Sequence, residues 1–176
     1  LPRGLLREPI KNLRRADYVF LTKSNGGSHL KHLRHFIKRH NRGAEIIECT
    51  HKPIHLEDIY SGERKPLEFL KGKRLASISA IARPESFEHF LRKLGGDLVY
   101  CERYMDHHRY RQQQVIDFVN ASLEHQADLI LATEKDAVRF PKLDRRDLPI
   151  YFLRVEIDIL SGEETFNECI TRICFL

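Results

Sequence analysis

Short apolar runs alternate with amphipathic stretches along this 176-residue chain. We expect buried strands where the apolar runs are continuous, at residues 18–21, 44–49, 75–81, 98–100, 128–132 and 150–160. Apolar positions at helical spacing predict helices at residues 10–16, 29–40, 85–94, 111–120 and from 162 onward. Because strands and helices alternate over most of the chain, the sequence predicts right-handed βαβ units and an α/β fold, with a mainly parallel sheet and flanking helices.

Residues 51–72 differ in pattern from the stretches on either side. Polar and apolar residues alternate here around Ser61-Gly62, with prolines before and after this turn. The alternation is typical of a β-hairpin, and the prolines suit exposed edges better than a central strand. We therefore expect a connector over 51–72 that separates a first domain, residues 1–50, from a second, residues 73–176.

Composition narrows the class of protein. Apolar residues make up 41% of the chain and include 10 Phe and 6 Tyr, which is enough for a packed core. The four cysteines form no CxxC pair, which favours a reducing compartment and argues against a structural zinc site. No apolar run approaches the roughly 20 residues that a membrane-spanning helix needs. The first residue is Leu1 rather than Met, so we expect a fragment or a processed product.

Positive charge is concentrated in the first third of the chain. Residues 1–50 carry 11 Lys/Arg against 4 Asp/Glu, whereas the remainder carries 19 against 21. Each cation held near an anionic bilayer contributes about 1 kcal/mol, so this region can bind an anionic membrane surface; a solvated protein surface explains the charge equally well. The basic residues lack interleaved aromatic residues for stacking on bases, so no nucleic acid is expected as a partner. His29, His32, His35 and His40 share the basic helix, where we expect solvated side chains rather than metal ligands.

Residues capable of chemistry gather in three loops that each follow a predicted strand. These loops carry Arg83, Asp106-His107-His108 and Thr133-Glu134-Lys135-Asp136. The carboxyl ends of parallel strands lie on one edge of a sheet, so we expect the three loops to leave the same edge. Cations, carboxylates and imidazoles gathered in this way suit an anionic ligand or proton transfer.

Each of these loops also has a purely structural explanation. Thr133-x-x-Asp136 matches a helix capping box, and Arg83 can be a surface residue at the start of a helix. An Asp beside a His, as in Asp106-His107, often fixes one tautomer of the imidazole by a loop hydrogen bond. The letters Asp-His-His also occur in DHH phosphoesterases, but the further aspartates and histidines that hold two metals in those enzymes are not evident here.

Several catalytic motifs are absent from the sequence. It contains no GxxxxGK[ST] or GxGxxG loop to cradle nucleotide phosphates, and no GxSxG elbow or zincin helix. Taken by itself, the chain reads as an α/β module that supplies one face of an active site.

Several spaced segments resemble one family in the right order. LPRGLLREP followed by RADYVFLT is similar to the LPAGPLREP…RADAVV segment of the tetraacyldisaccharide 4′-kinases, or lipid A 4′-kinases. HKP, PLEFLKGKR, ISAIARPESFEHFLRKLG, YMDHHRY and ILATEKDAVRF continue the similarity, which covers residues 1–140 and, more weakly, the end of the chain. One departure is Ala80, which stands where the family usually has glycine.

The resemblance implies transfer of the ATP γ-phosphoryl group to the 4′-hydroxyl of tetraacyldisaccharide 1-phosphate, a lipid A disaccharide precursor, to form lipid IVA. It implies a peripheral enzyme at the cytoplasmic face of the inner membrane of a Gram-negative-type bacterium. Residues 1–50 then resemble the C-terminal part of a P-loop kinase core, 51–72 a two-stranded linker, and 73–176 a smaller Rossmann-like domain. In the family the P-loop and the Mg²⁺-binding aspartates precede Leu1. ATP and Mg²⁺ are therefore expected to be bound mainly outside this chain, which is expected to hold no metal and to be inactive alone.

The resemblance also implies roles for individual residues. His107, oriented by Asp106, would help to accept the proton of the sugar hydroxyl, while Arg7 and Glu8 would act at the nucleotide phosphates. Phosphoryl transfer depends mainly on positioning and charge neutralisation, which suits these groups. Candidates for lining the same cleft are Arg83, Glu134 and Lys135. The alternative is a stand-alone basic α/β module that binds anionic lipid or nucleic acid.

Overall fold

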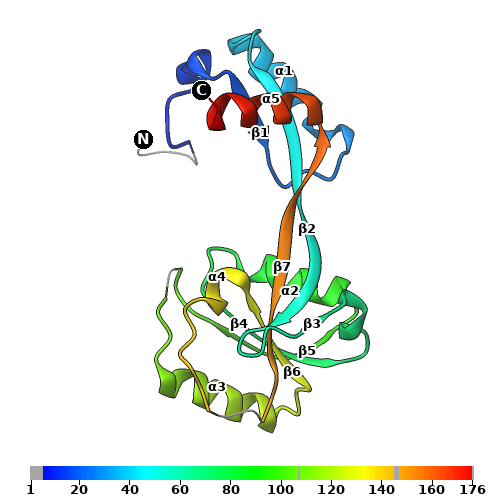
Figure 1. Cartoon of the computed structure of the whole chain (residues 1–176), viewed down its shortest axis with the longest axis vertical. Coiled ribbons are helices and arrows are strands. Elements are labelled where there is room, and N and C mark those ends of the chain that lie inside the picture. Colours follow the sequence, from blue (N-terminus) through cyan, green and yellow to red (C-terminus); the bar gives the residue numbers. More distant parts are fainter. Residues whose placement is uncertain (1–5, 107, 145–146, 176) are drawn as a thin grey trace. The chain divides into compact units, whose positions relative to one another are not determined.

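A computed structural model describes residues 6–106, 108–144 and 147–175 of the chain (Figure 1). Its sheet has the strand order β1-β2-β7-β6-β4-β5, with β3 paired to β2. The strands are β1 (Tyr18–Leu21), β2 (Glu45–Asp58), β3 (Arg64–Lys65), β4 (Arg74–Ser79), β5 (Asp97–Arg103), β6 (Leu129–Thr133) and β7 (Ile150–Ser161). The α-helices are α1 (Lys31–His40), α2 (Pro84–Lys93), α3 (Gln112–Glu124), α4 (Glu134–Ala137) and α5 (Glu163–Cys174); the 3₁₀ helices are η1 (Ile10–Arg15), η2 (Ser28–Leu30) and η3 (Leu67–Leu70).

Parallel pairing dominates this sheet. The pairs β1–β2, β4–β5, β4–β6 and β6–β7 are parallel, and β2–β3 is antiparallel. The predicted α/β fold with a mainly parallel sheet and flanking helices is therefore confirmed.

The predicted elements are present with small shifts at their ends, except for β2. The sequence predicts that this strand ends at residue 49, whereas it continues to Asp58. The chain then turns and pairs back through β3, with Leu56 opposite Lys65 and Glu57 opposite Arg64. The expected hairpin over 51–72 is thus present, but its first arm is the continuation of β2. Alternating polar and apolar residues suit both descriptions, because a strand and a hairpin arm share the same period.

The chain forms two compact units. Unit 1 comprises Leu1–Lys52 and Ile157–Leu176, and unit 2 comprises Pro53–Glu156. Both β2 and β7 contribute residues to the two units. This division differs from the one expected from the sequence, which assigned everything after residue 72 to a second domain. The end of β7 and the whole of α5 belong to unit 1, and the expected boundaries remain a prediction for the protein as a whole.

Unit 2 has a central strand, β4, with β5 and β6 on its two sides (Figure 1). Successive side chains of a strand point to opposite faces of the sheet. Ile78 accordingly packs in a cluster with Phe118 of α3, whereas Leu75 packs in a second cluster with Leu91 of α2. Helices therefore cover both faces of these strands, which is the usual environment of parallel strands with continuous apolar sequence.

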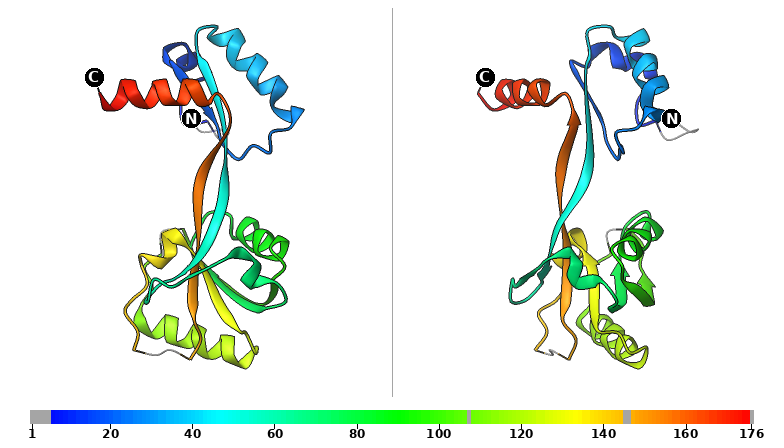
Figure 2. Two further views of the ribbon diagram at one scale, coloured as in Figure 1. Left: turned by 45° about the vertical axis from the view of Figure 1, so that its right-hand side comes forward. Right: turned by 90° about the vertical axis from the view of Figure 1, so that its right-hand side faces the viewer.

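In unit 1 as well, helices cover both faces of a strand, here β1 (Figure 2). Leu21 of β1 and Ile37 of α1 belong to one buried cluster. Phe20, on the opposite face of β1, contacts Phe166 of α5 edge-on, with ring centroids 6.2 Å apart. The helices α1 and α5 therefore pack on opposite faces of β1.

Candidate functional site

Three loops leave one edge of the sheet in unit 2. The β4–β5 and β4–β6 pairs are both parallel, so the carboxyl ends of these strands lie on the same edge. The loop after β5 is joined to the end of β4 by the N–H of Tyr104, which donates to the carbonyl of Ser79 at 2.9 Å. The prediction that the loops carrying Arg83, Asp106 and Thr133 leave a common edge is confirmed.

Asp136 connects two of these loops from a fully buried position. Its Oδ2 atom accepts hydrogen bonds from the hydroxyl of Thr133 at 2.6 Å and from the backbone N–H of Ala80 at 3.2 Å. The hydroxyl of Thr133 also caps α4 by accepting from the N–H of Asp136 at 3.3 Å. The guanidinium of Arg139 lies 4.0 Å from Oδ1. The helix-capping role, which was the structural alternative for Thr133-x-x-Asp136, is therefore present. The Asp136 carboxylate also holds the β4–α2 loop against the start of α4.

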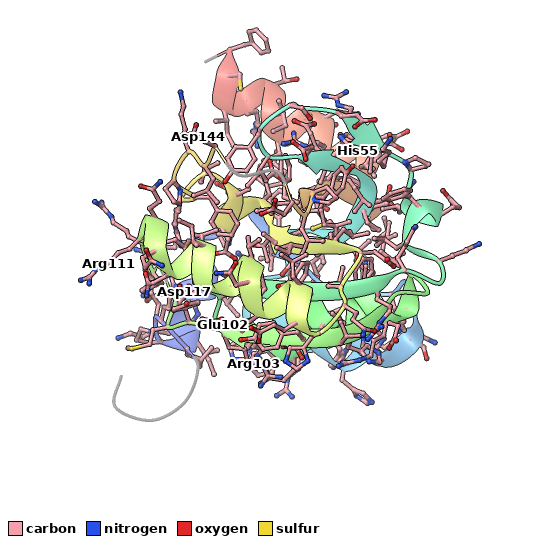
Figure 3. The ribbon with its side chains drawn as sticks, turned by 90° about the horizontal axis from the view of Figure 1, so that it is seen from below. His55, Glu102, Arg103, Arg111, Asp117 and Asp144 are labelled. Atoms are coloured by element: carbon pink, nitrogen blue, oxygen red, sulfur yellow. The ribbon has the colours of Figure 1, made fainter. Side chains whose placement is uncertain are left out.

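Tyr104 and Tyr110 both belong to the β5–α3 loop, between Glu102 and Arg111, which are labelled in Figure 3. Burial of Tyr104, together with its hydrogen bond to Glu102, raises the pKa of its phenol. Burial also raises the pKa of Tyr110, and the nearby carboxylate of Asp136 adds to the effect. Both phenols therefore stay protonated at neutral pH, so neither is a base.

The Asp106-His107-His108 motif lies in the same loop. His107 falls outside the described residues, so its predicted catalytic role stays a prediction. Asp106 is exposed to solvent. His108 is half-buried, and its ring stacks on Tyr104 with centroids 4.4 Å apart. The two described members of the motif thus differ in environment: Asp106 is exposed, and His108 is half-buried against Tyr104.

The other predicted cleft residues lie at the same edge. Arg83 is exposed at the residue preceding α2, and Lys135 is exposed in α4. Glu134 is half-buried and forms an ion pair with Arg154 of β7. The structure thus brings these side chains to one edge, and their contact with a ligand stays a prediction.

Arg7 and Glu8 belong to unit 1 and precede η1. The Glu8 carboxylate accepts hydrogen bonds from the Asn12 amide at 3.1 Å and from the Arg15 guanidinium at 2.6 Å. The hydrogen bond from Asn12 and the charge of Arg15 lower the pKa of Glu8. Arg7 is exposed. These contacts make Glu8 a brace for η1, a role that the sequence does not predict.

Sequence reasoning also misses a buried polar cluster around Glu48. The Glu48 carboxylate accepts hydrogen bonds from the hydroxyl of Ser24 and the guanidinium of Arg34, and Arg34 donates to the hydroxyl of Ser161 at 2.7 Å. The hydrogen bonds from Ser24 and Arg34 hold the pKa of Glu48 below its usual value. A carboxylate within the apolar segment Glu45–Cys49 is the sequence signal for such a cluster, because a buried charge needs partners.

The described part of the chain contains neither a cluster of metal ligands nor a helix that could span a membrane. Among residues 6–106, 108–144 and 147–175, no three His, Cys, Asp or Glu side chains lie close enough together to hold a metal ion. Where Mg²⁺ binds stays a prediction. None of the helices described is both long and apolar enough to cross a bilayer.

Comparison with known proteins gives a consistent result. A family model described as tetraacyldisaccharide-1-P 4′-kinase matches residues 1–174. The tetraacyldisaccharide 4′-kinase of Elusimicrobium minutum is 38% identical over 95% of this chain, and that of Syntrophus aciditrophicus is 32% identical over 98%. These matches cover 44% and 48% of the two relatives, so the chain spans about half the length of the curated relatives it matches.

A solved structure is similar in fold. The crystal structure of LpxK from Aquifex aeolicus, described as an "apo" form in complex with ATP, matches with a TM-score of 0.61 at 20% sequence identity. The match covers 99% of this chain and 48% of the Aquifex chain. At this identity the likeness concerns the fold alone.

Proposed function

The chain belongs to the tetraacyldisaccharide 4′-kinase family, and from this premise we propose that it is part of a lipid A 4′-kinase. The proposed reaction transfers the γ-phosphoryl group of ATP to the 4′-hydroxyl of tetraacyldisaccharide 1-phosphate, which forms lipid IVA. We propose that the 176 residues are inactive alone, because their sequence contains no phosphate-binding loop.

The carboxyl edge of the unit 2 sheet is the observation that carries this proposal. Open α/β sheets bind ligands outside the carboxyl ends of their strands. At this edge Asp106 is exposed, as are Arg83 on the β4–α2 loop and Lys135 in α4. A carboxylate and two cations at one edge suit a substrate that carries phosphate and must lose a hydroxyl proton.

The proposed catalytic roles are those that the family resemblance implies, and they suit the requirements of phosphoryl transfer. We assign His107 to accept the proton of the 4′-hydroxyl, and Asp106 to orient its imidazole. Arg7 is assigned to the phosphate oxygens of the nucleotide, where a guanidinium gives a fixed, permanently charged donor. Glu8 supports Arg7 by holding the following turn through Arg15.

ATP and Mg²⁺ are assigned mainly to the part of the protein outside this chain. An acylated disaccharide substrate also implies work at a membrane, and α1 exposes Lys31, Lys38 and Arg39. We propose that these cations help to hold the enzyme at an anionic bilayer, as a peripheral protein on the cytoplasmic face of the inner membrane.

The test uses the full-length protein that contains this chain, supplied with ATP, Mg²⁺ and tetraacyldisaccharide 1-phosphate. We expect phosphate transfer from ATP labelled in the γ position to the lipid. His107→Ala should lower turnover about 100-fold or more, because a general base contributes at least that factor.

The matched control is His89→Ala, which removes an exposed imidazole from α2. It should leave turnover within about twofold of the wild type. Absence of transfer by the wild-type protein would contradict the proposed function. Equal turnover of His107→Ala and His89→Ala would contradict the assignment of His107 alone.

A further inference from the structure

The peptide group that ends β4 is held from both sides. Its carbonyl, on Ser79, accepts a hydrogen bond from the N–H of Tyr104 at 2.9 Å. Its N–H, on Ala80, donates to Oδ2 of Asp136 at 3.2 Å. The backbone pairing of β4 with β6 ends two residues before Ala80, so a side chain supplies the acceptor that a strand carbonyl supplies further back. The Asp136 carboxylate therefore joins the end of β4 to helix α4.

The same carboxylate places two cations relative to each other. Its Oδ2 atom also accepts the hydroxyl of Thr133 at 2.6 Å, at the N-cap of α4. Lys135 is the neighbour of Asp136 in the chain, so their Cα atoms are about 3.8 Å apart. Arg83 follows Ala80 by three residues, so its Cα atom lies within roughly 11 Å of that of Ala80. Beyond Arg83 the chain enters α2, whose apolar side chains are packed in a buried cluster, so both ends of this short segment are fixed.

Both cations are available to an anion. Arg83 and Lys135 are exposed, and among residues 6–106, 108–144 and 147–175 neither side chain forms a hydrogen bond or an ion pair. Arg103, at the end of β5 on the same edge, differs: its guanidinium contacts the carboxylates of Glu88 at 2.8 Å and Glu85 at 2.9 Å. Cations without carboxylate partners, at the carboxyl edge of parallel strands, suit a phosphate group.

We propose that Asp136 is a positioning residue, which holds Arg83 and Lys135 at the spacing at which both cations bind the phosphate of the acylated disaccharide. This proposal rests on the proposed function, in which that lipid is a substrate. Asp136 is fully buried and acts through the two cations rather than on the substrate. The lipid phosphate is favoured over those of ATP, because ATP is assigned mainly to the part of the protein outside this chain. Loss of one charge-assisted contact weakens binding about 10-fold or more.

The kinetic test uses the full-length kinase, with each substrate varied in turn. Asp136→Ala should raise the KM for the lipid about 10-fold, and should leave kcat and the KM for ATP within about threefold of the wild type. Asp136→Asn keeps an oxygen that can accept from Ala80 and Thr133, so it should restore the lipid KM to within about threefold of the wild type.

The matched control is Asp128→Ala. The Asp128 carboxylate accepts the backbone N–H of Arg74 at 2.8 Å and so joins β6 to the opposite end of β4. Its removal should leave both KM values within about twofold of the wild type. A second control, Leu131→Ala, weakens unit 2 through its core and should also leave the lipid KM within about twofold while the protein is folded. A rise in the lipid KM with either control as large as that with Asp136→Ala would overturn the proposal.

A background without the two cations separates positioning from an independent contribution. Arg83→Ala/Lys135→Ala should raise the lipid KM about 10-fold or more. If Asp136 acts through these cations, adding Asp136→Ala should leave the lipid KM of that variant unchanged within about twofold. A further 10-fold rise would overturn the proposal, as would an unchanged lipid KM in Asp136→Ala alone or a rise confined to the KM for ATP.

A distance measurement does not depend on activity. Spin labels are attached at Arg83→Cys and Lys135→Cys in the full-length protein, with its other reactive cysteines replaced by serine. The distribution of label distances, measured by electron paramagnetic resonance, should be narrow, should broaden with Asp136→Ala and should stay narrow with Asp128→Ala. A distribution that is equally narrow without the Asp136 carboxylate would overturn the proposal.

A milder variant serves if Asp136→Ala does not fold. Thr133→Val removes one of the two hydrogen bonds to Oδ2 at nearly constant volume, and should broaden the distribution less and raise the lipid KM about threefold. Failure of the two inferences can be told apart. An inactive wild type whose label distances still broaden with Asp136→Ala contradicts the proposed function, whereas an active wild type whose lipid KM does not respond to Asp136→Ala contradicts the role of Asp136.

Discussion

The two compact units of this chain bury very different amounts of apolar side chain. Among the residues that the structure describes, unit 2 has two buried clusters, one on each face of its strands, built around β4, β6, α2 and α3. The described residues of unit 1 form one such cluster, whose buried members are Leu21, Ile37 and Ala44. Two apolar side chains of α1, Leu33 and Phe36, remain 43% and 37% exposed. They line an open, mainly apolar hollow of about 590 Å³ together with residues of η1 and β1.

Polar contacts also join the elements of unit 1. In unit 1, Glu48 joins the segment after β1, helix α1 and the end of β7 through its contacts with Ser24 and Arg34. The Asn41 side chain joins the end of α1 to η1, since its amide donates to the carbonyl of Leu13 at 3.0 Å. Each such hydrogen bond contributes about 1 kcal/mol, and the loss of one partner of a buried charge costs more than that. The proposed catalytic edge lies in unit 2, the unit with the larger apolar core.

The largest expected effect concerns the core of unit 2. Leu131→Ala removes a fully buried side chain of β6 and should cost about 3 kcal/mol or more, because a cavity adds to the lost transfer free energy. The control Leu33→Ala removes the same atoms from a side chain that is 43% exposed in unit 1, and should cost less than about 1 kcal/mol. Native-state hydrogen exchange, with peptides from residues 53–156 followed separately from the rest, measures both. Equal costs would show that the two units do not differ in the way described.

A smaller effect is expected for the polar cluster of unit 1. Glu48→Gln removes the charge that faces Arg34 and should cost about 2 kcal/mol near neutral pH, at the low end for a buried pair because Arg34 is 34% exposed. The pKa of Glu48 is lower in the folded protein than its ordinary value of 4.5, so its stabilising contribution is present above that pH and is lost as the pH falls through the folded-state pKa.

Stability of the wild type and the Glu48→Gln variant should therefore converge on acidification below about pH 4.5. Denaturant titration at a series of pH values measures this convergence. The matched control is Glu63→Gln, since Glu63 is 57% exposed in its pair with Lys65 and should contribute nothing measurable at any pH. A pH-independent difference for Glu48→Gln would mean that the lost interaction is not electrostatic.

The smallest effect is expected at the start of α4. Thr133→Ala removes an N-cap and a hydrogen bond to the buried Asp136 carboxylate, and should cost about 1 kcal/mol in unit 2. Thr171→Ala is the matched control in unit 1: its hydroxyl donates to the carbonyl of Asn167 within α5 and is exposed, so the change should be close to neutral. Thermal unfolding of the two variants measures the loss of stability that each change causes. No difference would mean that the Asp136 carboxylate is held without Thr133.

Much of the fold follows from local pattern. The apolar runs at β1, β6 and β7 and the helical spacing of α2 and α3 predict these elements, since each depends on residues that are neighbours in the chain. The length of β2 does not follow, because a continuous strand and a hairpin arm have the same alternation of polar and apolar residues. The candidate site follows only in part. Parallel strands bring the loops of Arg83 and Asp106 to one edge, but the sequence does not show that Asp136 joins the β4–α2 loop to α4.

The sequence by itself determined the order of strands and helices, the family and the three loops that carry polar residues. The elements and the loops between them depend on the period of side-chain directions along the chain, which is 2 for a strand and 3.6 for a helix. The family was indicated by several spaced motifs that match in the right order. Only the tertiary structure decided that α5 belongs to unit 1, that Glu48 has Ser24 and Arg34 as partners, and that the ring of His108 stacks on Tyr104. The physical reason is that a hydrogen bond or a packed face needs a specific partner, and the partner is selected by how the elements meet in space.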